Sequence, residues 1–218
     1  SDTIMSYNEG HKGWDTWFSE TDLNALFNIW GRENDLGKIN YDGISTNYKF
    51  KRTNDQKYFI KTIIGYEDVT DIKTLNFLDK SMEVKDEIID VFNTIKGIDD
   101  ITGKIYRLYN AAFARFPDKV GLDYWINNNK SGQDTYKKTA ESFLLSEEFI
   151  NLYGSSSNNE AYIKNLYSNV LERLPDNEGF NYWLNQIEKG VESKNELLMG
   201  FAESSESKLI FSAETGIL

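Results

Sequence analysis

The sequence has no cysteine, a single histidine (His11) and only two prolines among its 218 residues. Without cysteine the chain can form neither disulfides nor thiolate chemistry, so its fold has to depend on a hydrophobic core. A single imidazole excludes a zinc centre that is held by several histidines. No run of 18 apolar residues is present, and we therefore expect no membrane-spanning helix.

Positive charge is also scarce. Lys and Arg total 24 against 35 Asp and Glu, which gives a net charge of -11. A negative field repels phosphate backbones, and clustered basic residues are missing, so we predict that nucleic acid is not a partner. Aromatic residues, in contrast, make up 14% of the chain. Because aromatic side chains bury large areas, a core can form without cysteine.

The second half of the chain contains an internal duplication. Ile105–Glu148 aligns without a gap on Ile163–Glu206, at an offset of 58 residues, and fourteen of the 44 aligned pairs are identical. Both prolines, Pro117 and Pro175, occupy the same place in this alignment. The repeated unit is therefore predicted to be one supersecondary structure that is used twice.

The first helix of each repeat is predicted from its apolar spacing. Apolar residues fall at i, i+3, i+4, i+7, i+8 and i+11 from Ile105 to Phe116, and again from Ile163 to Leu174. This spacing places them on one helical face. Proline disfavours helix in the residue before it, so the first helix should end near Phe116 or Leu174.

The second helix of each repeat follows from its capping residues. Asp118 and Asp176 are N-cap residue types, and Gly132 and Gly190 are typical of a helix end. A third helix is expected after this glycine, and the first repeat should finish in a short helical turn over residues 147–153, after Ser146.

Strand-forming and turn residues replace this pattern upstream of the repeats. The expected elements are a strand in Asn47–Lys51, a turn at Thr53–Gln56, a strand in Lys57–Ile64, short strands at Thr74–Leu78 and Ser81–Val84, and a joining helix over Asp86–Asp99. Together the patterns predict an α+β fold that is mainly α. A small N-terminal β-containing module should precede an all-α domain of two similar helical repeats.

The expected division has three parts. Residues 1–40 form the first segment, residues 41–90 a small β-rich module, and residues 91–218 the duplicated helical domain, with repeats over about 101–154 and 159–212.

The first segment carries the sequence Ser-Asp-Thr-Ile-Met5-Ser-Tyr7, followed by the helical pattern of Phe18–Gly31. It resembles the Met-turn and the following C-terminal helix of serralysin-like zinc metalloproteases, which belong to the metzincin class. The resemblance implies that Met5 lies in the Met-turn and that Tyr7 is a vestigial zinc ligand. A short apolar turn that packs on the following helix is the alternative interpretation of both residues.

The chain differs from that family in one decisive feature, because it lacks the HExxHxxGxxH helix. We therefore expect no catalytic residue, no complete metal site and no cofactor in this chain. Zinc and peptidase activity would belong to a full-length parent that also contains the catalytic part.

The β-rich stretch has a likeness of its own. Asn47–Thr53 and Gly65–Asp79 are similar to a segment of secreted calcium-repeat (RTX-type) proteins, although the nonapeptide repeat itself is absent. Asp68, Asp71 and Asp79 offer oxygens of the kind that calcium binds, and solvated surface aspartates are the alternative interpretation.

The repeats share the motif Arg-x-Pro-Asp-x-x-Gly-x-x-Tyr-Trp. This motif resembles a helical domain of unknown function that occurs near the C-termini of secreted and surface-layer-like bacterial proteins, and it is more distantly similar to the helical linker domains of phycobilisomes. The resemblance covers residues 100–212. The motif positions here are Arg115, Pro117, Asp118, Gly121, Tyr124, Trp125, Arg173, Pro175, Asp176, Gly179, Tyr182 and Trp183.

The motif residues have more than one interpretation. Arg115 and Arg173 either bind an anion or tie helix ends together and pair with an acid such as Asp118 or Asp176. The tryptophans either stack on sugar rings or belong to the core, and the tyrosine before each points elsewhere and stays partly exposed.

These features predict a non-catalytic accessory or interaction region of a secreted or surface-associated, metalloprotease-like bacterial protein. Its helical part would be a scaffold that binds a protein or a cell-surface or matrix component. A carbohydrate-binding module with exposed Tyr and Trp is the alternative. The residues Glu214–Leu218 are similar to the ends of proteins exported by a type I-like route, which implies secretion or a cell-surface location.

Overall fold

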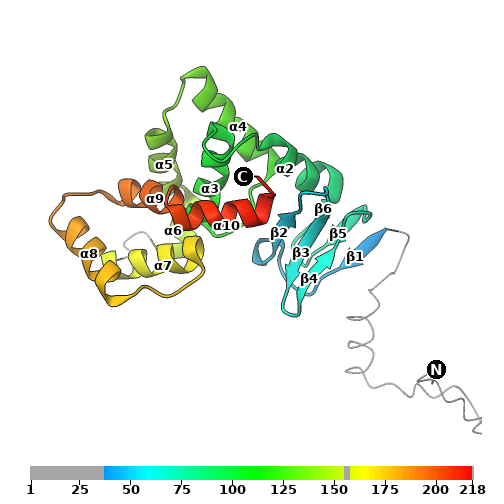
Figure 1. Cartoon of the computed structure of the whole chain (residues 1–218), viewed down its shortest axis with the longest axis horizontal. Coiled ribbons are helices and arrows are strands. Elements are labelled where there is room, and N and C mark those ends of the chain that lie inside the picture. The colour runs from blue at the N-terminus through cyan, green and yellow to red at the C-terminus, as the bar shows by residue number, and fades with distance from the viewer. Residues whose placement is uncertain (1–36, 155–157, 218) are drawn as a thin grey trace, which may run out of the picture.

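The computed structural model describes residues 37–154 and 158–217. Met5, Tyr7 and the rest of the chain up to residue 36 lie outside this part. Two small β-sheets come first and helices form the larger part of the molecule (Figure 1). The fold is therefore α+β and mainly α, as predicted.

The first sheet has three short strands, β1 (Lys38–Asn40), β5 (Thr74–Asn76) and β6 (Ser81–Glu83). β1 runs parallel to β5, and β6 is antiparallel to β5. Leu75, on the central strand, is completely buried. β5 and β6 confirm the strands expected there, whereas β1 was not predicted, because three residues are too few to show an alternating pattern.

The second sheet is an antiparallel meander of β2 (Lys49–Arg52), β3 (Tyr58–Thr62) and β4 (Gly65–Asp68). The predicted strand Lys57–Ile64 is wrong at its end, because Ile63 and Ile64 form the turn between β3 and β4. The next residue, Gly65, has φ +133°, a conformation that side chains rarely permit. The glycine thus allows the chain to reverse where the apolar run suggested a continuing strand.

The predicted joining helix is displaced toward the N-terminus. A π-helical segment, Val84–Ile89, leads directly into α2 (Asp90–Thr94). The helix ends because Ile95 is extended, with φ -76° and ψ 123°. Asp86–Asp99 is therefore wrong at both ends, and the expected boundary between residues 90 and 91 falls inside α2.

The described helical part contains four helices in each repeat. They are α3 (Ile101–Phe113), α4 (Lys119–Ser131), α5 (Tyr136–Leu144) and α6 (Glu147–Tyr153) in the first repeat, then α7 (Asn159–Leu171), α8 (Asn177–Glu188), α9 (Lys194–Ala202) and α10 (Ser205–Thr215) in the second. A side-chain oxygen caps most of their N-termini, at Asp100, Asp118, Thr135, Ser146, Asn158, Asp176 and Ser204.

The first helix of each repeat ends three residues earlier than predicted, at Phe113 and Leu171. The next residues, Ala114 and Glu172, are left-handed, with φ 53° and 52°. Such a residue ends a helix because its N–H bonds back to a carbonyl of the last turn, and a non-glycine residue there costs about 1–2 kcal/mol. This unfavourable backbone conformation occurs at the same position in both repeats.

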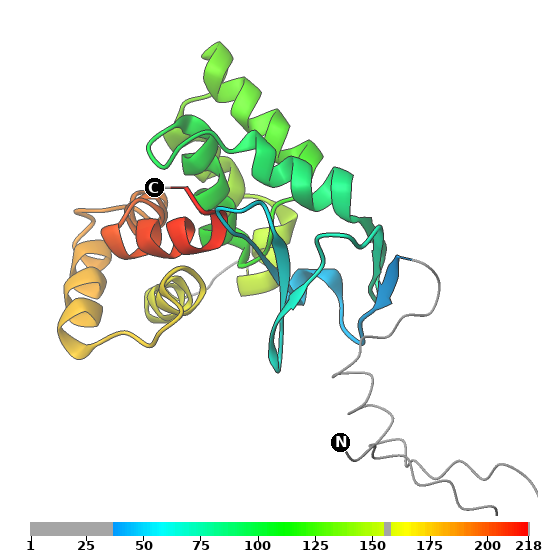
Figure 2. The same ribbon diagram turned by 45° about the vertical axis from the view of Figure 1, so that its right-hand side comes forward.

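The two repeats interlock around α3. This helix packs on α4, α5 and α6 of its own repeat and on α7 and α9 of the other. β2 lies against α10, so the second sheet contacts the end of the second repeat (Figures 1 and 2). The buried apolar side chains of the strands and helices form one continuous core.

Candidate functional site

The repeated arginines make their shortest side-chain contacts with glutamates near the end of each repeat. Arg115 donates from Nε to Glu148 Oε1 over 2.5 Å and from Nη2 to Oε2 over 2.9 Å. Arg173 makes the same two bonds to Glu206, at 2.7 and 3.1 Å. Two parallel bonds of this kind fix both position and orientation. The turn after the first helix of each repeat is thereby tied to the start of its last helix.

The expected pairing with Asp118 or Asp176 is present as the longer contact, since each aspartate lies 3.5 Å from its arginine. The reason is that both carboxylates cap a helix. Asp118 Oδ1 accepts from the N–H of Gly121 over 2.7 Å, and Asp176 Oδ1 from the N–H of Gly179 over 2.8 Å. The bond from Gly179 lowers the pKa of Asp176. The predicted N-cap role is confirmed.

Each motif glycine lies against a tyrosine hydroxyl. A Cβ at Gly121 would come within 2.3 Å of the Tyr109 oxygen, and a Cβ at Gly179 within 2.3 Å of the Tyr167 oxygen. Both tyrosines are only 4% exposed, so they have little room to move. The glycine is thus needed for close packing between the first and second helices of the unit.

Gly121→Ala is expected to lower the free energy of unfolding by about 1–3 kcal/mol, because the added methyl overpacks a buried contact. Urea denaturation followed by tryptophan fluorescence measures this change. Gly200→Ala is the matched control, since nothing lies within 4 Å of a Cβ there, and alanine in an open helical position should add up to about 1 kcal/mol. If Gly121→Ala is as stable as the wild type or more stable, Tyr109 can move away from the added methyl group without a loss of stability.

The tryptophans pack against the core but are not fully buried. The ring of Trp125 lies 5.3 Å from that of Phe143, and the ring of Trp183 lies 5.6 Å from that of Phe201. Each preceding tyrosine stands edge-on to its tryptophan and remains half exposed, Tyr124 at 54% and Tyr182 at 52%.

A second residue of the repeat is also exposed in both copies. Asn127 and Asn185 are identical positions one helical turn after the tyrosines, and both are exposed. Residues spaced by three lie on the same helix face. In the described part of the chain neither asparagine side chain makes a hydrogen bond within the molecule. We call these four residues, Tyr124, Asn127, Tyr182 and Asn185, the Tyr/Asn surface.

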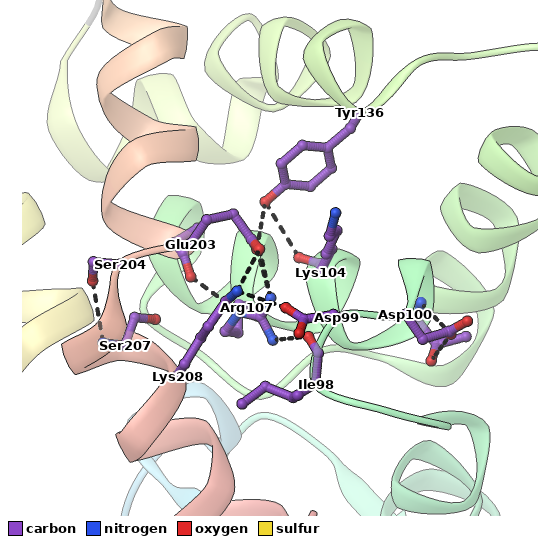
Figure 3. Close-up of polar contacts among 12 residues, drawn as sticks. Ile98, Asp99, Asp100, Lys104, Arg107, Tyr136, Glu203, Ser204, Ser207 and Lys208 are labelled. Carbon is purple, nitrogen blue, oxygen red and sulfur yellow. Dashed lines mark hydrogen bonds and ion pairs between the residues drawn. The ribbon is translucent and has the colours of Figure 1, made fainter. Parts of the chain in front are cut away.

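A buried ionic cluster joins the two repeats, and the sequence motifs did not predict it. Arg107, on α3, is 2% exposed and lies between the ends of α9 and α10 (Figure 3). Its Nε donates to the carbonyl of Ala202 over 3.0 Å, and its Nη1 to the carbonyl of Ile98 over 2.8 Å. Its Nη2 lies 2.7 and 2.8 Å from the two carboxylate oxygens of Glu203.

The rest of the cluster surrounds Glu203. Tyr136 donates its hydroxyl to Glu203 Oε1 over 3.3 Å, and burial together with this carboxylate raises the pKa of Tyr136. Lys208 Nζ lies 2.6 Å from Asp99 Oδ1 and 3.9 Å from Glu203 Oε2 (Figure 3). Across the described residues, every buried side-chain nitrogen or oxygen has a hydrogen-bond partner. The buried polar groups of the cluster are therefore all hydrogen-bonded, and the cluster has a structural role, which is to hold the two repeats together.

One sequence signal could have revealed this cluster. Arg107 and Glu203 are charged in one repeat only, since their counterparts are Asn165 and Leu145. A residue that serves the unit is repeated, whereas a residue that joins two units need not be.

Two of the aspartates considered for calcium accept hydrogen bonds within the fold, Asp68 in a local turn and Asp79 from a residue 34 positions away. Asp68 Oδ1 accepts from the N–H and the hydroxyl of Thr70, at 2.9 and 2.5 Å, and Asp79 accepts from the N–H and the hydroxyl of Ser45, at 2.6 and 2.8 Å. These bonds lower the pKa of both aspartates. Within residues 37–154 and 158–217, Asp68, Asp71 and Asp79 do not join any group of three or more residues that could hold a metal ion.

Comparison with known proteins gives one match. Residues 140–211, from the middle of α5 into α10, match the model of a domain of unknown function, DUF4214. No curated protein and no solved structure matches the chain. Among the helices of the described part, none is long and apolar enough to cross a bilayer. Residues 140–211 of the helical region are thus similar to a domain of unknown function.

Proposed function

We propose that the chain is a non-catalytic interaction region of a secreted or surface-associated, metalloprotease-like bacterial protein, and that its helical part is a protein-binding scaffold. The Tyr/Asn surface carries this proposal. The other motif residues of the repeat serve its internal packing. Of these four, the asparagine side chains make no hydrogen bond within the described residues, and each tyrosine contacts its neighbouring tryptophan but leaves half of its surface exposed. Polar and aromatic groups that are kept exposed in both copies are best explained by a partner outside the unit.

The metalloprotease part of the proposal rests on the likeness of the Ser1–Tyr7 segment to a Met-turn. Its direct test is the reading frame upstream of Ser1 in the gene. An HExxHxxGxxH sequence there supports a parent with zinc peptidase activity, and any other kind of sequence there contradicts this part of the proposal.

A carbohydrate-binding module is the second candidate, because an exposed tyrosine beside an amide is also suited to sugars. Tyrosine offers an apolar ring face and the amide offers both a donor and an acceptor. The duplication would provide two such sites in one chain, which raises the avidity for a polymer.

Tyr124→Ala/Tyr182→Ala tests whether the Tyr/Asn surface is the binding surface in either candidate function. We expect the wild type to bind cell-envelope protein that has been treated with periodate to destroy glycans, and the double variant to bind it at least about tenfold more weakly, a loss of about 1.4 kcal/mol. Biolayer interferometry with immobilised chain gives both affinities. Tyr66→Ala is the matched control, because Tyr66 is 50% exposed but lies outside the repeats.

The treatment of the target decides between the two functions. Binding that disappears after periodate treatment and returns on a glycan array supports the carbohydrate module. Equal binding by wild type and double variant contradicts the role of the Tyr/Asn surface in either function.

A further inference from the structure

The two repeats differ in how one equivalent face is covered. In the first repeat α2 and the π-helical segment pack on α4, and Leu122 and Ile126 of α4 are 0% and 3% exposed. In the second repeat α8 packs on α7 and contacts α9 through Trp183. No residue of α8 is buried, although Phe180 and Leu184 take the places of Leu122 and Ile126.

The turn before these helices shows the same difference. Phe116 is 8% exposed, and its ring lies 4.9 Å from Phe50 of β2 and 5.3 Å from Phe92 of α2. Its counterpart Leu174 is 84% exposed. The first repeat therefore shows that this face can receive apolar side chains. The second repeat covers the same face less completely, because Phe180 and Leu184 are only half-buried, Lys164 Nζ lies 5.2 Å from the centre of the Phe180 ring, and Leu174 is exposed. We call Leu174, Phe180 and Leu184 the open face.

A second apolar feature lies at the tip of the β3–β4 hairpin. Ile63 is 103% exposed and Ile64 is 60% exposed. Gly, Asn and Asp are the residues that such turns favour, and β-branched residues are a costly choice there. Neither isoleucine contributes to the core, so stability of the fold does not account for them. Both views show the hairpin extending away from the helices, while α8 lies at the far end of the molecule (Figures 1 and 2).

The two features differ in the sign of their local charge. The segment Lys49–Lys61, which leads to the tip, contains five lysines or arginines and one aspartate, and the returning segment, residues 65–71, adds Glu67, Asp68 and Asp71, which leaves a net charge of +1 over residues 49–71. The segment Asp176–Glu192, which contains α8, holds four acids and one lysine. In the described part of the chain Glu178 and Glu188 form no ion pair. The molecule already uses this pairing internally, since Lys49 and Lys61 both contact Glu172 of the second repeat.

We propose that the hairpin tip of one copy, Ile63 and Ile64, docks on the open face of a second copy. The two surfaces are different, so the contact is heterologous and leaves one free tip and one free face at the ends of every dimer. Repetition of such a contact extends into a chain or closes into a ring. This inference names a partner for the proposed scaffold function and rests on that function.

Complementation between two variants tests this geometry. Ile63→Asn/Ile64→Gly removes the tip with residues that suit a hairpin turn, and Leu174→Lys disrupts the open face at an exposed position. We expect the wild type to increase in mass beyond a dimer between micromolar and millimolar concentrations in sedimentation velocity, and each variant alone to stay monomeric. An equimolar mixture of the two variants should stop at a dimer, because only one tip and one face remain competent.

Leu145→Lys is the matched control, since Leu145 is 76% exposed and belongs to neither surface; it should associate as the wild type does. A wild type that stays monomeric at all concentrations overturns the proposal, as does association that both variants retain. A monomeric wild type that binds vesicles through Ile63 and Ile64 also overturns it in favour of a membrane contact. Binding of envelope protein by the monomeric variants would show that the proposed scaffold function does not depend on self-association.

Discussion

Arg107→Leu is expected to lower the free energy of unfolding by about 3–5 kcal/mol, because it leaves a carboxylate in a partly buried site without its partner. Glu203 would lose its two bonds to Arg107 and keep Tyr136 and the more distant Lys208. The carbonyls of Ala202 and Ile98 would lose their side-chain donors as well. Urea denaturation followed by tryptophan fluorescence measures the change.

Arg173→Leu is the matched control for this prediction. Arg173 makes an equally good two-bond contact with Glu206, but its side chain is 41% exposed against 2% for Arg107. Water solvates an exposed pair, so its loss should cost much less than the loss of Arg107. Equal effects of the two substitutions would show that burial of Arg107 adds nothing to the contact.

A double substitution identifies the cause of the Arg107 effect. Arg107→Leu/Glu203→Leu removes both charges and should regain much of the stability that Arg107→Leu loses, since the unpaired carboxylate is gone. A double variant that is no more stable than Arg107→Leu would assign the loss to packing against Phe211, whose ring lies 5.0 Å from the guanidinium carbon.

The second large effect is expected at Glu214, near the end of α10. Glu214 is 8% exposed, and its Oε2 accepts from Asn110 Nδ2 over 3.4 Å. Burial raises the pKa of this carboxyl from 4.5 to about 7, and Glu172 contributes further, whereas Lys49 and Lys61 act in the opposite direction. The hydroxyl of Tyr106 on α3 and the ring of Tyr66 on β4 also face it.

The raised pKa makes stability depend on pH in a defined direction. The folded protein holds the Glu214 proton more tightly than the unfolded chain does, so the stabilising contribution is complete below pH about 4.5 and is lost as pH rises through about 7. At 1.36 kcal/mol per pKa unit, the free energy of unfolding should fall by up to about 3 kcal/mol between pH 5 and pH 8 because of this group.

Glu214→Gln tests this pH dependence, because the amide is neutral throughout. We expect the variant to be about 1–3 kcal/mol more stable than the wild type at pH 8 and to lose most of the difference at pH 5. Denaturation curves at a series of pH values measure both. Glu178→Gln, at an exposed position without an ion pair, should reproduce the wild-type profile. If the free energy of unfolding depends on pH in the same way in Glu214→Gln and in the wild type, the pKa of Glu214 is not raised in the folded protein.

The local parts of the fold could be predicted from the sequence. Asp118, Ser146 and Gly132 marked helix ends correctly, because capping depends on a few neighbouring residues. The apolar stripe around Leu108 and Leu166 identified the first helix of each repeat, because its period belongs to the helix itself. The duplication predicted that structural residues would recur.

Errors arose where local signals compete. Ile63 and Ile64 favour a strand by propensity, yet Gly65 turns the chain there. Asp118 is the nearest acid to Arg115 in sequence and lies 3.5 Å from it, but its carboxylate also caps the N-terminus of α4. The sequence did not show that the shorter contact comes from Glu148, 33 residues away.

By itself, the sequence determined that the second half is a helical unit used twice, with its caps, glycines and tyrosine–tryptophan pairs in the same places. Only the tertiary structure decided which copy of an equivalent position is covered, as for Phe116 and Leu174, and which charge is buried, as for Arg107. The physical reason is that periodicity and capping are interactions along the chain. Burial, in contrast, depends on segments such as β2, α2 and α9 that folding brings together from distant positions.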